Sequence, residues 1–397
     1  MMPGMPETIE PFTISTHPAA LDDLRGRLRR TRWPERETGA GWSQGVPLGY
    51  LQGLCRYWAD GYDWPSTQDR LNRIPQFVTT IDGLDIHFLH VRSADPGAVP
   101  LIMTHGWPGS FLEFEQVLGL LAGLPGYHDG ASDGGTGRFH LVVPSLPGYA
   151  FSGKPASAGW DIHRIAHTWA ELMTRLGYPR FLAEGSDWGT SVSTSLALQH
   201  ADRLLGIHLV PPLVAPDRAA AGLTAAERTA LADLDERART GSGYSAMHGT
   251  RPQTIGYSLL DSPAGLCAWI GEKLWAWTDH GGDLGQVLSA DQVLDNVTLY
   301  WLTGTGASSA RLYWESIAEV TGWFTSATSD TIAVPTACSV FPKEVPRPSR
   351  RWAGHRLRNI VYWNEPDRGG HFAAWEQPTL FAAEVRAAAR ACTQAAG

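Results

Sequence analysis

The sequence predicts an α/β protein with a mainly parallel central sheet, a helical cap inserted into that sheet, and an N-terminal extension. In residues 96–210, short buried strands alternate with helices, an order typical of a parallel sheet covered by helices on both faces. The alternation stops in residues 211–330, which are helical, loop-rich and rich in tryptophan. Strand signals resume in residues 331–397, so the helical stretch is interpreted as an insertion between two parts of one core.

Composition limits the classes of partner. The chain has 397 residues, 43% of them hydrophobic, which is enough for a large core with additional domains. A formal charge of −8 and a pI of about 5.9 argue against nucleic acid and anionic membranes as partners. The four cysteines form no CxxC pair, and neither a signal-peptide pattern nor an apolar run of about 18 residues occurs. We therefore expect a cytoplasmic protein with reduced thiols and no membrane anchor.

The N-terminal extension, residues 1–95, is expected to wrap the core. Its first ten residues show no pattern and are predicted to be a loose tail. Leucines recur on one face of a predicted helix over 18–30, and a second helix is predicted over 48–62. Residues 76–91 predict a β-hairpin, because the pair Asp82-Gly83 is a strong two-residue turn signal between β-rich flanks.

The two parts of the core are predicted element by element from short apolar runs and amphipathic stretches. The glycine-rich tract 129–137 predicts a flexible surface loop rather than a phosphate-binding loop, because no Lys-Ser/Thr pair follows it. The predicted strands cover 100–104, 140–143, 181–183, 205–210, 336–340 and 359–363, and the predicted helices cover 114–121, 162–176, 190–200 and 379–395.

The stretch Gly185-Ser-Asp187-Trp-Gly189 predicts a nucleophile elbow with aspartate as the nucleophile. An apolar strand precedes it and a helix-compatible run follows, and strand, sharp turn and helix is the context that such a motif requires. Glycine at both ends fits a crowded, strained turn. A carboxylate exposed there can attack an electrophilic carbon and form an ester. Serine esterase chemistry is disfavoured, because Ser186 lies one residue away and would face the wrong way.

A base and an acid are expected to assist Asp187. His371 follows the last predicted strand, and a histidine after the nucleophile matches the order nucleophile, acid, histidine of the α/β-hydrolase fold. Glu344 also follows a strand and is the favoured acid to orient that histidine. Glu365 and Asp367 are alternatives, although their closeness to His371 in sequence would aim them away from it.

Backbone amides are expected to form an oxyanion hole. The amide of Trp188, directly after the nucleophile, is one candidate, and the amide of Trp107 is the other. Trp107 lies in a loop after the first core strand, where Gly106 allows a close backbone approach and Pro108 stiffens the turn. We also expect His105, Gly106, Pro108 and Trp188 to contact the substrate.

Three motifs together resemble the microsomal-type epoxide hydrolases of the α/β-hydrolase superfamily. They are His105-Gly-Trp-Pro-Gly-Ser110, Gly185-Ser-Asp-Trp-Gly189 and Gly369-Gly-His-Phe-Ala-Ala-Trp375. The resemblance covers nearly the whole chain and includes the N-terminal domain of that family, from Pro11 to about Val91. The mammalian members carry an N-terminal membrane anchor that is missing here, so the resemblance implies a soluble, bacterial form.

The resemblance implies that two cap tyrosines hold the epoxide oxygen and protonate it. Tyr313, in Ser308-Ser-Ala-Arg-Leu-Tyr313, matches one of them, and Tyr244, in Gly241-Ser-Gly-Tyr244, matches the other. Tyr257 and Tyr300 are the nearest alternatives. A phenol with a pKa near 10 can protonate an alkoxide while remaining neutral itself. The implied cycle forms a glycol ester on Asp187, which water activated by His371 and Glu344 then hydrolyses to a vicinal diol.

The expected partners are a small-molecule epoxide and water, without metal or organic cofactor. The aromatic cap suggests a bulky aromatic epoxide, in detoxification or in secondary-metabolite biosynthesis, and a homodimer is left open. A haloalkane dehalogenase with the same aspartyl ester and a non-catalytic receptor on this fold are the alternatives. His163 and His167 lie four apart on a predicted helix, but Arg164 replaces the glutamate that the zincin pattern requires, so they are interpreted as a helix-surface pair.

Overall fold

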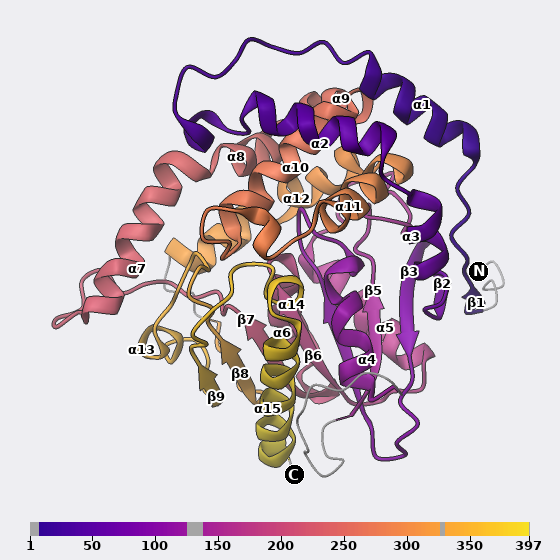
Figure 1. The fold of residues 1–397 in the computed structure, drawn as a ribbon. Coiled ribbons are helices and arrows are strands. Elements are labelled where there is room, and N and C mark those ends of the chain that lie inside the picture. Colours follow the sequence, from indigo (N-terminus) through magenta and orange to yellow (C-terminus); the bar gives the residue numbers. More distant parts are fainter. Residues whose placement is uncertain (1–7, 125–137, 326–329, 397) are drawn as a thin grey trace.

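The computed structural model describes residues 8–124, 138–325 and 330–396. A single nine-stranded sheet crosses the molecule in the order β1-β2-β3-β5-β4-β6-β7-β8-β9 (Figure 1). The predicted tail is ordered in part, because Glu10–Pro11 forms strand β1 against β2. The predicted loop 129–137 lies outside the described residues.

The N-terminal extension supplies the antiparallel edge of the sheet. Strands β2 (Gln76–Ile81) and β3 (Leu84–Val91) form the predicted hairpin, and both turn residues have positive φ, 51° at Asp82 and 75° at Gly83. Strand β3 then pairs antiparallel with β5 (Phe139–Pro144). The hairpin therefore belongs to the same sheet as the core.

The remaining strands are parallel, as predicted, and their carboxyl ends share one edge of the sheet. Their near-continuous apolar sequences fit a sheet that is covered on both faces. These strands are β4 (Val99–Thr104), β5, β6 (Phe181–Ser186), β7 (Leu204–Val210), β8 (Thr336–Ser339) and β9 (Ile360–Asn364).

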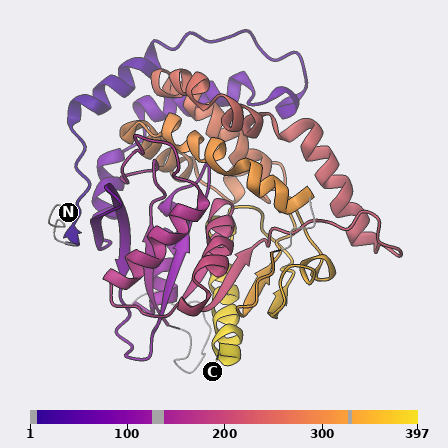
Figure 2. The ribbon, with the colours of Figure 1, turned by 180° about the vertical axis from the view of Figure 1, so that it is seen from behind.

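Helices cover both faces of the sheet. Helices α4 (Glu115–Ala122) and α15 (Pro378–Ala396) pack on the face that is in front in Figure 1. Helices α5 (Ile162–Arg175) and α6 (Trp188–Gln199) pack together on the opposite face, which is in front in Figure 2. This arrangement is an α/β-hydrolase core, and it confirms the predicted fold class.

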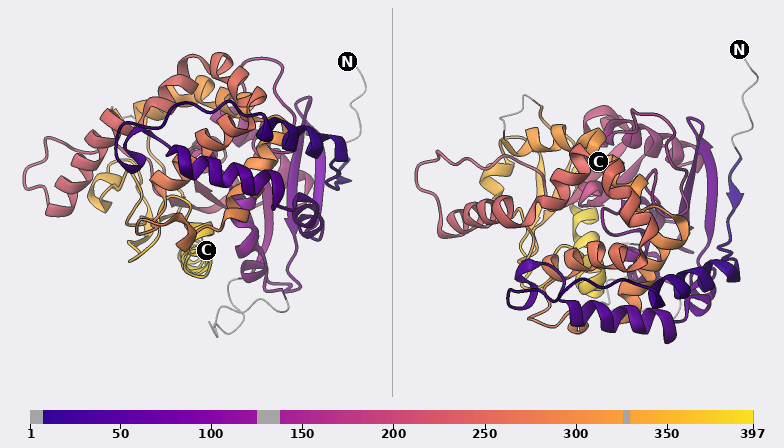
Figure 3. Two further views of the ribbon diagram at one scale, coloured as in Figure 1. Left: turned by 45° about the horizontal axis from the view of Figure 1, so that its top comes forward. Right: turned by 90° about the horizontal axis from the view of Figure 1, so that it is seen from above.

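The cap lies over the carboxyl edge of the sheet, and the helices of the N-terminal extension lie along its outer side (Figure 3). The extension contributes α1 (Pro18–Arg29), α2 (Leu48–Asp60) and α3 (Trp64–Leu71). The cap consists of α7 (Ala225–Glu236), the π-helical turn η4 (Arg237–Gly241), α8 (Gly243–Thr250), α9 (Pro252–Asp261), α10 (Pro263–Trp277), η5 (Leu284–Gln286), α11 (Ala290–Thr303) and α12 (Gly306–Thr325). Short helices at the edges complete the chain: η1 (Gly41–Gln44), η2 (Phe111–Phe114), η3 (Ala201–Arg203), α13 (Arg350–Ala353) and α14 (Ala373–Glu376).

Within the described ranges, no helix combines the length and the apolar character that a bilayer crossing requires.

Candidate active site

The nucleophile elbow joins β6 to α6. Asp187 has φ 52° and ψ −120°, a conformation that residues with side chains rarely adopt. A Cβ on Gly185 would lie 2.0 Å from the carbonyl oxygen of Gly189, and a Cβ on Gly189 would lie 1.8 Å from the carbonyl oxygen of Thr104. Both positions therefore exclude any side chain, and the turn leaves the Asp187 carboxylate on the wall of a cavity.

His371 lies between two carboxylates. Its Nε2 is 3.3 Å from Asp187 Oδ2, and its Nδ1 is 2.8 and 3.0 Å from the two carboxylate oxygens of Glu344. Glu344 follows β8 and His371 follows β9, so neighbouring parallel strands bring acid and base to the edge that carries the elbow. His371 is 6% exposed and Glu344 is 2% exposed, so both interactions are shielded from solvent.

The surrounding charges determine the protonation of these groups. Burial would lower the pKa of His371, but the carboxylates of Glu344 and Asp187 raise it to about 10. Burial would raise the pKa of Asp187, yet that pKa lies below its usual value because His371 and the amides of Trp107 and Trp188 stabilise the charge. At neutral pH the resting site therefore holds an imidazolium between two carboxylates.

The two alternative acids face away from His371. Glu365 and Asp367 are exposed on the surface. Glu365 accepts a hydrogen bond from the indole N–H of Trp363 at 3.0 Å, and Asp367 lies 3.5 Å from Arg368 Nη1. The geometry therefore favours Glu344 as the partner of the histidine.

The loop after β4 brings a backbone donor to the nucleophile. The N–H of Trp107 donates to Asp187 Oδ1 at 2.9 Å, and a Cβ on Gly106 would lie 2.2 Å from the same oxygen. His105 accepts the N–H of Leu146 through Nε2 at 3.2 Å, so Nδ1 carries the proton and donates to the Gly106 carbonyl at 3.0 Å. Because that carbonyl and the Trp107 N–H belong to one peptide group, His105 orients the donor.

Tyr244 on α8 and Tyr313 on α12 line the same cavity as Asp187. Their ring centroids are 5.7 Å apart at an interplanar angle of 82°. The ring of Trp107 stacks on Tyr244 with centroids 5.0 Å apart, and the ring of Trp188 meets Tyr313 edge-on at 4.7 Å. Burial raises the pKa of both phenols, so both are neutral proton donors at neutral pH.

The two alternative tyrosines do not line this cavity. Tyr257 is 69% exposed on α9. Tyr300 is buried, and its hydroxyl donates to the carbonyl of Gly109 at 2.7 Å.

The cavity has a volume of about 350 Å³ and an apolar wall. Of the four residues expected to contact the substrate, Trp188 lines it, whereas His105, Gly106 and Pro108 do not. None of the six cap tryptophans lines it either, although the ring of Trp277 packs against His371 with centroids 4.9 Å apart. The apolar part of the cavity wall includes Leu213, Leu234, Ile317, Val320 and Phe324, together with Val345 and Pro346. The six tryptophans are Trp269, Trp275, Trp277, Trp301, Trp314 and Trp323.

Arg237 also lines the cavity, and sequence reasoning missed it. Its Nη1 donates to the carbonyl of Val345, its Nη2 lies 3.5 Å from the hydroxyl of Tyr244, and its guanidinium lies 5.0 Å from the ring centroid of Trp277. None of the described carboxylates forms an ion pair with it. Arg237 precedes Tyr244 by seven residues, and the π-helical turn at 237–241 turns it toward the cavity, which no sequence pattern signals.

The histidine pair on α5 bonds to neighbouring helices. His163 lies 2.7 Å from both Ser195 Oγ and a carboxylate oxygen of Glu319, and His167 Nδ1 lies 3.4 Å from His200 Nε2. In the part of the chain that the structure describes, no group of three or more His, Cys, Asp or Glu side chains is placed to hold a metal ion.

Comparisons with known proteins agree with the fold. Residues 9–114 match the family described as "Epoxide hydrolase N terminus", and residues 99–382 match the family described as "alpha/beta hydrolase fold". The class is thus an α/β hydrolase with an additional N-terminal domain.

Individual relatives narrow this class. A protein of Stigmatella aurantiaca, named provisionally as an epoxide hydrolase, is 50% identical over 379 residues, which cover 95% of this chain and 84% of that protein. Epoxide hydrolase 1 of Sus scrofa is 33% identical over 405 residues, which cover 96% and 88% of the two chains. The solved structure of Aspergillus niger epoxide hydrolase has 33% identity and a TM-score of 0.86 over 96% of each chain. The chain belongs to the epoxide hydrolase family, and it is an enzyme.

Proposed function

We propose that this epoxide hydrolase works through a covalent ester on Asp187 and acts on compact apolar epoxides. The observation that carries the mechanism is the hydrogen-bonding of the Asp187 carboxylate. Oδ1 accepts the Trp107 N–H at 2.9 Å, and Oδ2 lies 3.3 Å from His371. Oδ1 is thus positioned to become the ester carbonyl oxygen, and Oδ2 is the oxygen that attacks.

In the first half-reaction, Oδ2 attacks one epoxide carbon and the carbon–oxygen bond of the ring breaks. Tyr244 and Tyr313 donate hydrogen bonds to the departing oxygen, and one of them transfers its proton to it. Arg237, 3.5 Å from the Tyr244 hydroxyl, stabilises the phenolate that remains. The proton of the His371 imidazolium then returns to the phenolate, which leaves a neutral imidazole beside the ester.

In the second half-reaction, neutral His371 removes a proton from water, and the hydroxide adds to the ester carbonyl carbon. Glu344 stabilises the imidazolium that forms. The amides of Trp107 and Trp188 stabilise the negative charge that develops on Oδ1. Collapse breaks the ester bond, releases the vicinal diol and restores the Asp187 carboxylate beside protonated His371, so protons and charge balance over the cycle.

The cavity supports the substrate class. A volume of about 350 Å³ lies at the small end of the range for ligand pockets, roughly 300–1,000 Å³. The apolar side chains of its wall are aliphatic apart from Phe324, Trp188 and the two tyrosines. We therefore propose aryl or short alkyl epoxides rather than bulky polycyclic ones. A comparison of kcat/KM for styrene oxide, short alkyl oxiranes and a polycyclic epoxide tests this, and preference for the polycyclic epoxide would refute it.

A single turnover in heavy-oxygen water tests the covalent route. Excess enzyme reacts with styrene oxide, and the first diol and the peptide that contains Asp187 are then weighed. The ester route places ordinary oxygen in the first diol and the heavy label on Asp187. A labelled first diol with an unlabelled aspartate would instead show direct attack by water.

A further inference from the structure

The loop that carries the oxyanion-hole donor is held from the cap side by helix α11. Asn296 Nδ2 donates to the carbonyl of Pro108 at 2.7 Å, and Asn296 Oδ1 accepts the hydroxyl of Ser110 at 2.9 Å. One turn further along α11, the hydroxyl of Tyr300 donates to the carbonyl of Gly109 at 2.7 Å. Two side chains of one helix therefore hold three consecutive residues of the loop.

These hydrogen bonds are fully enclosed. Asn296 and Ser110 are 0% exposed and Tyr300 is 2% exposed. A buried carbonyl that loses its hydrogen-bond donor is destabilised by about 1–3 kcal/mol, because its desolvation is no longer compensated. That cost favours movement of the loop backbone toward another donor. Gly109 contributes no side chain that could replace these contacts, and a Cβ there would overlap the carboxyl group of Glu113.

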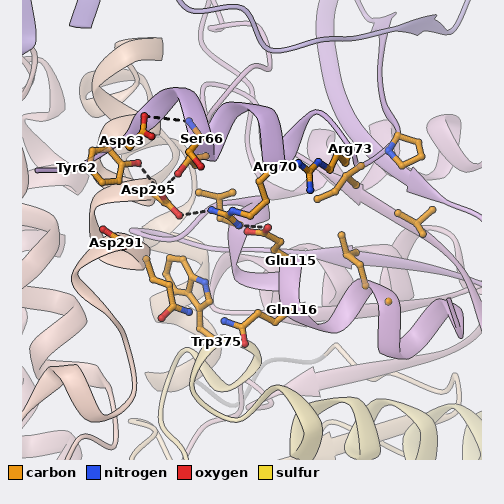
Figure 4. A pocket seen from close by; sticks show the side chains of 18 of the residues that line it. Tyr62, Asp63, Ser66, Arg70, Arg73, Glu115, Gln116, Asp291, Asp295 and Trp375 are labelled. Atoms are coloured by element: carbon orange, nitrogen blue, oxygen red, sulfur yellow. Dashed lines mark hydrogen bonds and ion pairs between the residues drawn. The ribbon is translucent and has the colours of Figure 1, made fainter. Parts of the chain in front are cut away.

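Helix α11 is in turn fixed by the N-terminal extension. Asp295, next to Asn296, accepts the hydroxyls of Tyr62 at 2.6 Å and Thr67 at 2.8 Å on Oδ1, and Arg70 donates to its Oδ2 at 2.6 Å. Figure 4 shows Asp295 on the wall of a surface groove, between Tyr62 and Arg70. Arg70 also contacts Glu115, so one guanidinium pairs with both Asp295 and Glu115. Neighbouring positions of α11 thus bind the extension on one side and the oxyanion-hole loop on the other.

We propose that Asn296 and Tyr300 are positioning residues for the second half-reaction: they hold the carbonyls of Pro108 and Gly109 so that the Trp107 N–H stays directed at Asp187 Oδ1. This inference rests on the proposed covalent mechanism. The Trp107 N–H matters most when negative charge develops on Oδ1, during hydrolysis of the ester. Opening of the epoxide depends on Oδ2 and on the tyrosines, so it is much less sensitive to this donor.

The variants Tyr300→Phe and Asn296→Leu test the assignment. Tyr300→Phe removes one hydrogen bond to the loop and Asn296→Leu removes two, and each variant retains a side chain of similar shape. Tyr149→Phe is the matched control, because Tyr149 is also buried and its hydroxyl also donates to a backbone carbonyl, that of Ser309 on α12, at 3.1 Å. The ring of Tyr149 packs against His105 and Tyr300, with centroids 5.4 and 6.2 Å apart. Phenylalanine retains these ring contacts, so the variant removes only the hydrogen bond to Ser309.

Rapid-quench experiments with excess enzyme and styrene oxide measure formation and decay of the alkyl-enzyme separately, by intact-protein mass. Loss of one oxyanion-hole donor costs about 10²–10³-fold, so partial misplacement of the donor should slow decay of the ester by roughly 10-fold or more. Formation of the ester should stay within about twofold of the wild type, and Tyr149→Phe should leave the ratio of the two rates unchanged.

If ester formation and ester decay fell by the same factor in Tyr300→Phe and Asn296→Leu, the proposal would be overturned. Selective slowing of ester decay in Tyr149→Phe would overturn it too. Unchanged decay of the ester in both variants would overturn it as well. Absence of any alkyl-enzyme in the wild-type protein would instead refute the covalent mechanism, so the two failures are distinguishable.

Discussion

Replacing Glu344 by glutamine should stall the enzyme at the ester. Glutamine keeps the volume of the side chain and can still accept the Nδ1–H of His371, but it removes a negative charge 2.8 Å from the ring. Glu344 is one of the two carboxylates that raise the pKa of His371 to about 10 against the effect of burial. In the ester form Asp187 has also lost its charge, so neither of the two carboxylates that contact the ring would remain to stabilise the imidazolium that forms when water is deprotonated.

The magnitude follows from the bond that is weakened. A buried hydrogen bond to a charged group contributes about 1.5–3 kcal/mol, and 1.4 kcal/mol corresponds to a factor of ten, so hydrolysis of the ester should slow roughly 10- to 150-fold. Attack by Asp187 makes no direct use of Glu344, so formation of the ester should change by less than about threefold.

Acid quenching of a reaction with styrene oxide, followed by intact-protein mass, measures both rates. Glu365→Gln is the control, because Glu365 is exposed and its carboxylate accepts a hydrogen bond from Trp363 rather than from His371. We expect normal decay of the ester in that variant and slow decay in Glu344→Gln. If formation of the ester in Glu344→Gln slowed as much as its decay, the assignment of Glu344 to the hydrolytic step would be wrong.

Three further outcomes are expected. Tyr244→Phe and Tyr313→Phe should each slow formation of the ester at least roughly 10-fold, and the double variant more than about 100-fold, because general acid catalysis supplies about 10²–10⁴-fold. Rapid-quench rates of ester formation equal to the wild-type rate in all three variants would contradict this. Burial raises the pKa of Tyr244 and Arg237 offsets part of that rise, so Arg237→Met should let the phenol keep its proton to higher pH. The alkaline limb of ester formation in a stopped-flow pH profile should then move upward, and an unmoved limb would exclude the electrostatic role. Gly189→Ala should abolish folding, since the added Cβ would lie 1.8 Å from a carbonyl oxygen. Gly53→Ala, in open space on α2, should instead stabilise the protein by about 1 kcal/mol. Thermal unfolding of both variants checks the contrast.

The parts of the site that follow from local sequence were predictable. Asp187 and Trp188 lie in one turn whose glycines are needed for steric reasons that the motif already shows. His371 and Glu344 could be proposed because residues that follow parallel strands meet at one edge of the sheet. The sequence favours Glu344 over Glu365 because Glu365 lies close to His371 in the chain, and the structure adds the hydrogen bonds of Glu344 to His371 and of Glu365 to Trp363. The two tyrosines came from family resemblance, since spacing alone did not separate Tyr244 from Tyr300.

The contacts that sequence reasoning missed join segments far apart in the chain. Asp295 bonds to residues 225–233 positions earlier, and Asn296 to a residue 188 positions earlier, so no local pattern links them. Helix α3 was missed although Asp63 caps it and a proline stands in its first turn, a start signal that its eight-residue length makes easy to overlook. The aromatic cap suggested a bulky aromatic substrate, but none of the cap tryptophans lines the cavity, since large aromatic rings also serve ordinary packing.

The N-terminal extension has a consequence for how the chain folds during synthesis. Its helix α3 finds its partner on α11 only after about 225 further residues have been made, which takes roughly 10–45 s at about 5–20 residues per second. Its strand β3 pairs with β5 rather than with the next strand in sequence, so the hairpin also waits for later residues. During this interval Trp58 and Cys55, both 2% exposed in the finished fold, have no cap to cover them. The extension is therefore synthesised well before the residues that bury it, and its apolar side chains add to the aggregation risk of the nascent chain.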